Sequence, residues 1–170
     1  MNHANYMDGI NAFESKYDYD CTYMREILDA SPEGYAKFDQ VSALAAHREL
    51  LDLESYWVAK LAAMKAADCG KCLQLNVRLA LEDGADVELV RACVKDGHGL
   101  SPALQDVYAY AQAVATYAVH DDELFARITS RYNKGQLLEF GLCISTAIFY
   151  PTIKRAVGYT QQCLLVDITL

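Results

Sequence analysis

The sequence predicts an all-α protein. Apolar residues recur with a helical period along most of the 170 residues, and only the last stretch, CLLVDITL (residues 163–170), alternates as a strand does. Ser-Pro pairs and glycines separate the periodic stretches as helix start and stop signals. Residues 1–21 mix Tyr, Asp and Asn without a period. We therefore expect an N-terminal arm that wraps the domain or a neighbouring subunit, followed by a single domain over residues 22–170.

Capping signals mark the first helices of this domain. TYMREILDA, residues 22–30, has the pattern of a short helix. Ser31 can cap the next helix with Pro32 in its first position, and this helix is expected to continue to about His47. Residues 48–67 then form either an extension of it or a third helix.

A further helix is expected to begin at the stretch DCGKC, where Asp68 can act as the N-cap. It should end at Gly84, because glycine readily adopts the left-handed conformation found at helix C-termini. A short helix closed by Gly97 follows. The last helices are expected over residues 101–120, 121–132 and 134–150, with Pro151 beginning or kinking a final one that ends at residue 158.

The composition excludes several classes of function. With 53% hydrophobic residues and a net charge of −8, the chain is globular and acidic. It lacks the clustered Lys and Arg that nucleic-acid binding requires, so no nucleic acid is expected as a partner. No stretch approaches the roughly 20 uninterrupted apolar residues that span a bilayer, and the N-terminus does not resemble a signal peptide. We therefore expect no membrane partner, a cytoplasmic location and reduced thiols.

Two cysteines three positions apart, Cys69 and Cys72, are the sharpest motif in the sequence. In the first turn of a helix they would meet the positive end of the helix dipole, which favours a thiolate, and Lys71 adds a positive charge. Residues three apart also lie on one helix face, so the two sulfurs can form a disulfide. The pair is therefore a candidate redox dithiol.

Two other interpretations of the pair stay open. A structural zinc site needs four ligands, and the sequence offers no second Cys-x-x-Cys or His-x-x-x-His pattern, so no metal is expected. The pair could also be inert core thiols, as we expect for Cys93 and Cys143, which lie inside apolar runs. No glycine-rich phosphate loop is present, and no cofactor is expected.

The segment YWVAKLAAMKAADCGKCLQLNVRLALEDGADVELVRA resembles the central part of the carboxymuconolactone decarboxylase and alkylhydroperoxidase D-like superfamily. SPEGYAKFDQVSAL is similar to its opening and YNKGQLLEFGLCISTAIFYPTIKRAVG to its closing helices, so the resemblance spans roughly residues 23 to 160. It implies an alkylhydroperoxidase D-like helical bundle that assembles as a homo-oligomer. Tyr108, Tyr110 and Tyr117 are expected at the subunit contacts.

Peroxidase members of that superfamily carry a Glu twelve positions before the first Cys and a His four positions after the second. This sequence has Trp57 and Asn76 there, so it departs from the family at both positions. Asn76 can hydrogen-bond the Cys72 sulfur but cannot take its proton, and Trp57 adds apolar bulk that raises a thiol pKa. Glu54, one turn before Trp57, is a candidate substitute carboxylate, although a solvated surface position is also compatible with it.

These observations lead to three hypotheses. The first is a thiol-disulfide oxidoreductase that reduces a small-molecule peroxide, alkyl hydroperoxide or disulfide through Cys69 and Cys72, with a dithiol electron donor as its partner. The second is a non-catalytic or ligand-binding family member. The third is a carboxymuconolactone decarboxylase-like lyase, which the cysteine pair and the lack of a histidine between His47 and His98 argue against.

Overall fold

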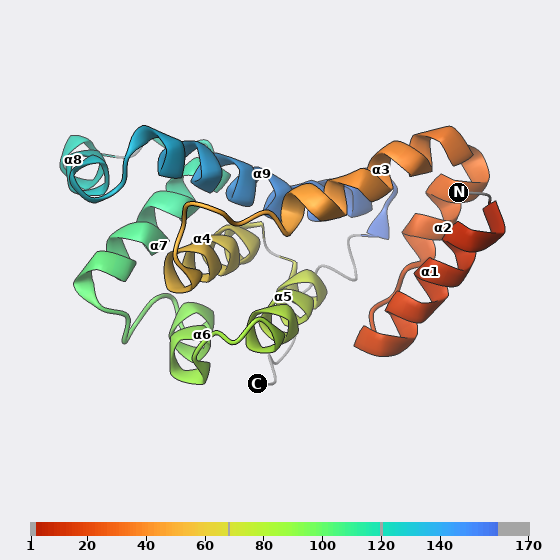
Figure 1. The fold of residues 1–170 in the computed structure, drawn as a ribbon, viewed down its shortest axis with the longest axis horizontal. Helices are drawn as coiled ribbons and strands as arrows, with labels where there is room; N and C mark the ends of the chain where they lie inside the picture. Colours follow the sequence, from red (N-terminus) through yellow and green to blue (C-terminus); the bar gives the residue numbers. More distant parts are fainter. Residues whose placement is uncertain (1–2, 68, 120, 160–170) are drawn as a thin grey trace.

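The computed structural model describes residues 3–67, 69–119 and 121–159, which contain nine α-helices and no strand. The all-α prediction is confirmed for these residues, while Asp68 and the strand-like residues 163–170 lie outside them. Figure 1 shows α1 and α2 at one end of the protein and α8 at the other. The helices are α1 (His3–Tyr17), α2 (Thr22–Ala30), α3 (Pro32–Ala45), α4 (Leu53–Ala66), α5 (Gly70–Glu82), α6 (Val87–Val94), α7 (Pro102–Ala115), α8 (Asp122–Arg131) and α9 (Lys134–Ala156).

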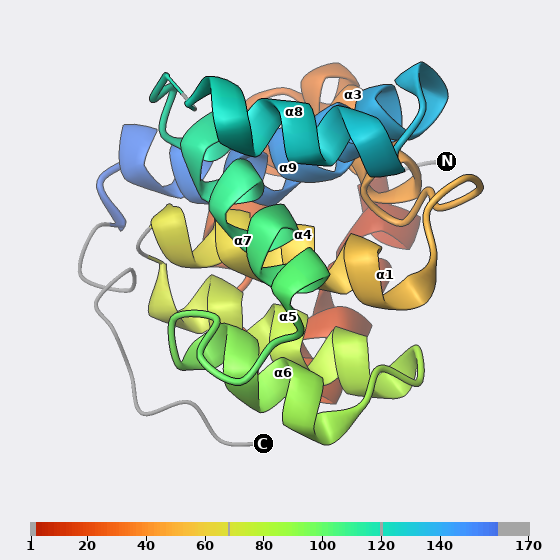
Figure 2. The same ribbon diagram turned by 90° about the vertical axis from the view of Figure 1, so that its left-hand side faces the viewer.

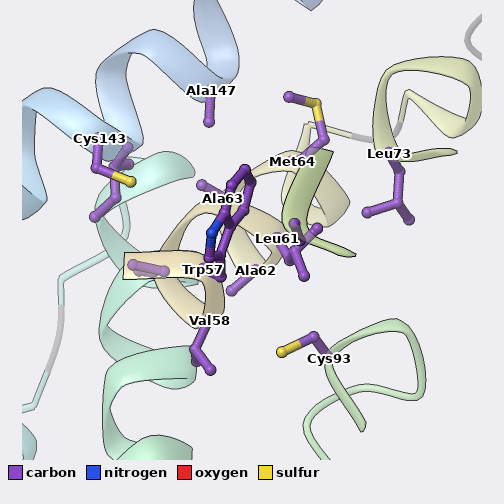
Figure 3. Packing of buried hydrophobic residues seen from close by; sticks show 14 of the residues in the cluster. Trp57, Val58, Leu61, Ala62, Ala63, Met64, Leu73, Cys93, Cys143 and Ala147 are labelled. Carbon is purple, nitrogen blue, oxygen red and sulfur yellow. The ribbon is translucent and has the colours of Figure 1, made fainter. Parts of the chain in front are cut away.

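Helix α4 is the central helix of the core. Residues 55–64 are all buried, as is typical of a helix that is apolar on every side. It contacts α5, α6, α7 and α9. Figure 3 shows Trp57 and Val58 leaving α4 on different sides, with Cys143 of α9 and Cys93 of α6 on opposite sides of the helix. Because α4 is surrounded, its side chains form the central part of the core against which these four helices pack.

Side-chain caps fix where α3 and α4 begin. The Ser31 hydroxyl accepts a hydrogen bond from the Gly34 N–H at 3.1 Å, as the sequence predicted for the start of α3. This helix ends at Ala45, slightly earlier than expected. The Asp52 carboxylate accepts from the Ser55 N–H at 2.8 Å and starts α4 afresh. Residues 48–67 therefore contain a third helix and do not extend the second.

The loop between α3 and α4 is held by a carboxylate from α9. Buried Glu139 accepts hydrogen bonds from the main-chain N–H groups of Glu49, Leu50 and Leu51 at 3.0, 2.8 and 3.2 Å. Burial raises the pKa of Glu139, but the three N–H donors outweigh burial and hold the pKa below its usual value. A single side chain thus satisfies three donors of a loop far away in sequence.

The N-terminal residues differ from the aperiodic arm that the sequence indicated. Residues His3–Tyr17 form α1, a 15-residue helix, and its Ile10 and Tyr17 are buried. The Tyr6 ring packs edge-on against Tyr35 of α3 with centroids 5.0 Å apart. Helix α1 also contacts α2, and Figures 1 and 2 show it beside the rest of the domain. The few apolar residues of α1 that contact the domain gave too weak a pattern to reveal a helix.

Helix α9 is continuous through Pro151, where the sequence predicted either the start of a final helix or a kink. It runs through Lys134–Ala156 with Pro151 inside it and buried. Among the described residues, α9 is the one helix that is long and apolar enough, by length and composition alone, to cross a membrane. Core helices of soluble proteins can meet the same criteria, and α9 contacts α3, α4 and α7.

The tyrosines of α7 are distributed differently from the expected subunit contact. Tyr108 and Tyr110 are only 5% and 8% exposed and belong to the core of the chain itself. Tyr117 lies beyond the end of α7 and is 86% exposed. The first two are therefore not available to a second copy, and the prediction for them is wrong.

Replacing Glu139 with alanine should lower the free energy of unfolding by about 3 kcal/mol, because one buried and two partly buried N–H groups lose a charged acceptor. Glu33→Ala, at an exposed position of α3, is the control and should change it by less than about 0.5 kcal/mol. Urea unfolding of both variants measures this.

The contribution of Glu139 to stability should depend on pH. Because the folded pKa of Glu139 is lowered, this contribution is present above pH 4.5 and lost as pH falls through the folded pKa. A difference from wild type that stays constant on acidification would contradict this account.

Candidate functional site

The cysteine pair lies at the start of α5, as the sequence predicted. Cys69 is the N-cap residue, and Cys72 is in the first turn of the helix. Both thiols are buried, with exposed fractions of 1% and 2%. The unpaired N–H groups of a helix start stabilise negative charge, so both sulfurs occupy a position that favours a thiolate. Our expectation that Asp68 is the N-cap is wrong by one position, because Cys69 is the N-cap of α5; Asp68 itself lies outside the described residues.

One of the two cysteines lines a large cavity. Cys72 lines a space of about 670 Å³ enclosed by α1, α2 and α3 on one side and α4, α5 and α9 on the other. Trp57 and Asn76, the two positions where the chain departs from the peroxidase pattern, line the same cavity. Cys69 is not among its lining residues. Most of the wall is apolar or aromatic, with Phe13, Tyr35, Phe38, Trp57 and Tyr150 among its rings.

The Cys72 sulfur contacts Tyr19, which in turn contacts Lys154 near the other end of the chain. The Tyr19 hydroxyl lies 3.4 Å from Cys72 Sγ, and Lys154 Nζ donates to the same hydroxyl oxygen at 3.4 Å. Burial raises the pKa of Tyr19 well above its ordinary value. The nearby Tyr23 and Cys72 raise it further, each by less than burial does. Tyr19 is therefore protonated at neutral pH. Because Lys154 occupies its oxygen as a donor, its own proton is available to the sulfur.

Lys154 is a buried cation without a carboxylate partner. Its exposed fraction is 0%, and no described carboxylate lies within 4.0 Å of Nζ. The ammonium lies over the rings of Tyr19 and Tyr23, 4.7 and 5.4 Å from their centroids. Such contacts stabilise a cation only in part. An acidic group nearby would balance the charge. The Cys72 thiol is such a group, and the Tyr19 hydroxyl connects it to Lys154.

Lys71 is exposed in the first turn of α5. It lines a second cavity of about 390 Å³ together with Tyr19, Lys154 and the acidic side chains of Glu14, Asp18 and Asp20. The positive charge of Lys71, which we expected to act on the thiol pair alone, therefore also lies near three carboxylates.

The structure changes the expected roles of Asn76 and Glu54. We expected Asn76 to bond the Cys72 sulfur, but its Nδ2 donates to the Cys72 main-chain carbonyl oxygen at 2.9 Å. Glu54 is exposed at the start of α4 and does not line the cavity. Trp57 Nε1 donates to Asp83 at 2.8 Å, which fixes the indole in the cavity wall.

Sequence reasoning missed Tyr19, Lys154 and Lys60, the lysine of α4 that lines the cavity. Lys60 did carry a signal, because it stands alone in the apolar run YWVAKLAAM. Tyr19 and Lys154 carried none, since they are 135 positions apart and meet only in the folded chain.

The other described cysteines are buried, as expected for Cys93 and Cys143. Burial raises the pKa of the Cys21 thiol to about 11 and those of Cys93 and Cys143 to about 12. Within the described ranges no three His, Cys, Asp or Glu side chains gather into a group that could hold a metal ion.

Comparisons of the chain with protein-family models, with curated proteins and with solved structures found no match. The resemblance to the alkylhydroperoxidase D-like superfamily therefore stays a prediction.

The thiols should differ sharply in reactivity. At pH 8 a thiol with a pKa of about 12 is ionised in only about one molecule in 10⁴, so Cys93 and Cys143 should resist iodoacetamide in the folded protein. Cys72 should be alkylated first, because it faces a cavity. Mass spectrometry of a time course measures the order, with urea-unfolded protein as the control for intrinsic reactivity. Equal rates for Cys72 and Cys93 in the folded protein would show that the cavity gives Cys72 no advantage.

Proposed function

We propose that this protein is a thiol-disulfide oxidoreductase in which Cys72 attacks a small-molecule peroxide or disulfide and Cys69 resolves the product. The observation that carries the proposal is the chain of contacts from Cys72 through the Tyr19 hydroxyl to buried Lys154. It supplies a hydrogen-bond donor and a positive charge to a sulfur that borders a cavity.

The electrostatic argument rests on charge balance. A buried ammonium without a counterion is unfavourable, and so is a buried thiolate. Here the Lys154 ammonium and a Cys72 thiolate would lie on either side of the Tyr19 hydroxyl, which donates to the thiolate and accepts from Lys154. Each charge then reduces the free-energy cost of burying the other. The start of α5 adds the partial positive charge of its free N–H groups. These terms favour a thiolate at Cys72 without the Glu and His of the family pattern.

The reaction balances with a peroxide and an external dithiol. The Cys72 thiolate attacks one peroxide oxygen and the O–O bond breaks, so that the sulfur becomes a sulfenic acid and the other oxygen takes a proton and leaves as water or an alcohol. The Cys69 thiolate then attacks the Cys72 sulfur, hydroxide leaves and takes a proton, and a disulfide forms. The external dithiol reduces this disulfide and is itself oxidised. With a disulfide substrate, the two leaving groups are thiolates.

The two other hypotheses are less well supported. A lyase of the decarboxylase type uses a histidine as acid or base, and no described histidine lines the cavity. A purely ligand-binding protein does not require a hydrogen-bond donor at the Cys72 sulfur or a buried lysine behind it, and both are present here.

Cys69→Ser and Cys72→Ser should each abolish turnover, because one sulfur forms the first bond and the other releases the product. Reduction of cumene hydroperoxide and of a small aromatic disulfide, each with dihydrolipoamide as electron donor, would measure it. Cys93→Ala, which removes another buried thiol, is the matched control and should retain activity. Full activity in either serine variant would refute the assignment, and no activity in the wild type would favour the ligand-binding hypothesis.

Lys154→Met should raise the pKa of the Cys72 thiol by about one unit or more, which corresponds to about 1.4 kcal/mol, because the thiolate loses its buried positive charge. The rate at pH 7 should fall about tenfold and recover at higher pH, which a merely misfolded variant would not do. Lys134→Met, at the exposed start of the same helix, is the control. The measurement is pH-dependent alkylation of Cys72. An unchanged pKa in Lys154→Met would remove Lys154 from the site.

A further inference from the structure

A second buried lysine borders the large cavity from a different helix. Lys60, in the middle of α4, is 6% exposed and lines the cavity. Its ammonium donates to the Ala45 main-chain carbonyl oxygen and, at 2.8 Å, to the Tyr56 hydroxyl oxygen. It also lies over the rings of Tyr56 and Trp57, 5.0 and 5.7 Å from their centroids. Two neutral acceptors and two rings therefore hold this cation.

No carboxylate of the described residues pairs with Lys60. The cavity wall holds two carboxylates, Asp39 and Asp83, and neither forms an ion pair with Lys60; Asp83 accepts from the Trp57 indole and lies 3.7 Å from Arg48. Burial lowers the pKa of Lys60, which shows that its surroundings compensate the charge incompletely. An ammonium group offers three donors, and the described contacts use two of them. Its third donor is free for a further acceptor in the cavity.

The rest of the cavity wall is suited to contact with the hydrocarbon part of a ligand. Aromatic rings from α1, α3 and α9, including Phe13, Phe38 and Tyr150, face the same space. Its volume of about 670 Å³ lies in the range of pockets that hold whole small molecules, roughly 300–1,000 Å³. Exposed residues, among them Asn5 and Ser42, belong to its rim, so the cavity reaches the surface.

We propose that this cavity binds an apolar monocarboxylic acid, with the carboxylate on Lys60 and the hydrocarbon body against the aromatic wall. A carboxylate supplies the anion and the acceptor that Lys60 lacks, and removal from water strengthens the pair. The hydrocarbon body buries apolar surface on both partners. This inference goes beyond the proposed redox function, because binding needs neither thiol.

Direct binding tests the proposal on the wild-type protein. Octanoate, decanoate, dodecanoate and 1-dodecanol are titrated by calorimetry below the concentrations at which they form micelles. We expect the affinity to rise about fourfold for each added methylene until the cavity is filled. Dodecanoate should bind at least about tenfold more tightly than 1-dodecanol, which has no charge for Lys60. Equal binding of acid and alcohol, or no saturable binding of any acid, would overturn the proposal.

Lys60→Met should reduce dodecanoate affinity at least about tenfold, toward that of the alcohol, while the affinity for 1-dodecanol is retained. Lys37→Met, at an exposed position of α3 outside the cavity wall, should bind as the wild type does. Circular dichroism verifies that both variants are folded. Wild-type affinity for dodecanoate in folded Lys60→Met would refute the role of Lys60.

A second pair of variants tests the cavity without touching any charge. Gly9 of α1 lines the cavity, and a Cβ there would meet no atom within 4 Å, so Gly9→Leu should extend into free space. Gly141 of α9 is equally free of close atoms but lies outside the cavity wall, which makes Gly141→Leu the matched control. We expect dodecanoate affinity to fall at least about tenfold only in Gly9→Leu. Equal affinities in the two variants would place the ligand elsewhere.

The same titrations on Cys72→Ser separate the two proposals. Unchanged dodecanoate binding together with lost turnover supports both of them. Binding by a wild-type protein that shows no turnover would overturn the redox proposal alone, and turnover without binding would overturn the ligand proposal alone.

Discussion

The burial of α4 on every side is the constraint on which the rest of the structure depends. A helix with ten consecutive buried residues cannot stand at the edge of a domain, because each of its faces must be covered. Helices α5, α6, α7 and α9 contact it, and the start of α5 is thereby held against the core. The same burial carries Lys60 into the interior, where an isolated charge is costly unless it is balanced.

The N-terminal helices turn this packed core into a protein with an interior space. Helices α1 and α2 do not fill the space beside α4 and α5 but enclose it, and the segment between them brings Tyr19 to the Cys72 sulfur. Two lysines from different helices, Lys60 and Lys154, are buried near this space, each over two aromatic rings and each without a described carboxylate within 4.0 Å. One is close to the thiol, and the other is held at the Ala45 carbonyl.

Local signals in the sequence were sufficient for much of the fold. Caps such as Ser31 and the glycine after α5, Gly84, act through neighbouring residues, so their positions could be read directly. The cysteine pair at the start of α5 was predictable for the same reason. Helix α1 was missed because its stability comes from contacts with α2 and α3 more than from its own period. The Tyr19–Lys154 contact could not be predicted, because no spacing rule links residues that far apart.

Helix α9 makes two separate polar contacts, one near each of its ends, and together they have a mechanical consequence. Near its start Glu139 holds the loop that leads to Arg48 and the rim of the cavity, and near its end Lys154 contacts Tyr19 beside the thiol. These residues are 15 positions apart on one helix, which corresponds to roughly 22 Å along its axis. One continuous helix therefore links the rim of the cavity to the Lys154–Tyr19 contact beside Cys72. Under the proposed redox function, a shift of α9 that widens the opening would also move the Lys154 ammonium, so that access to Cys72 and the acidity of its thiol would be coupled.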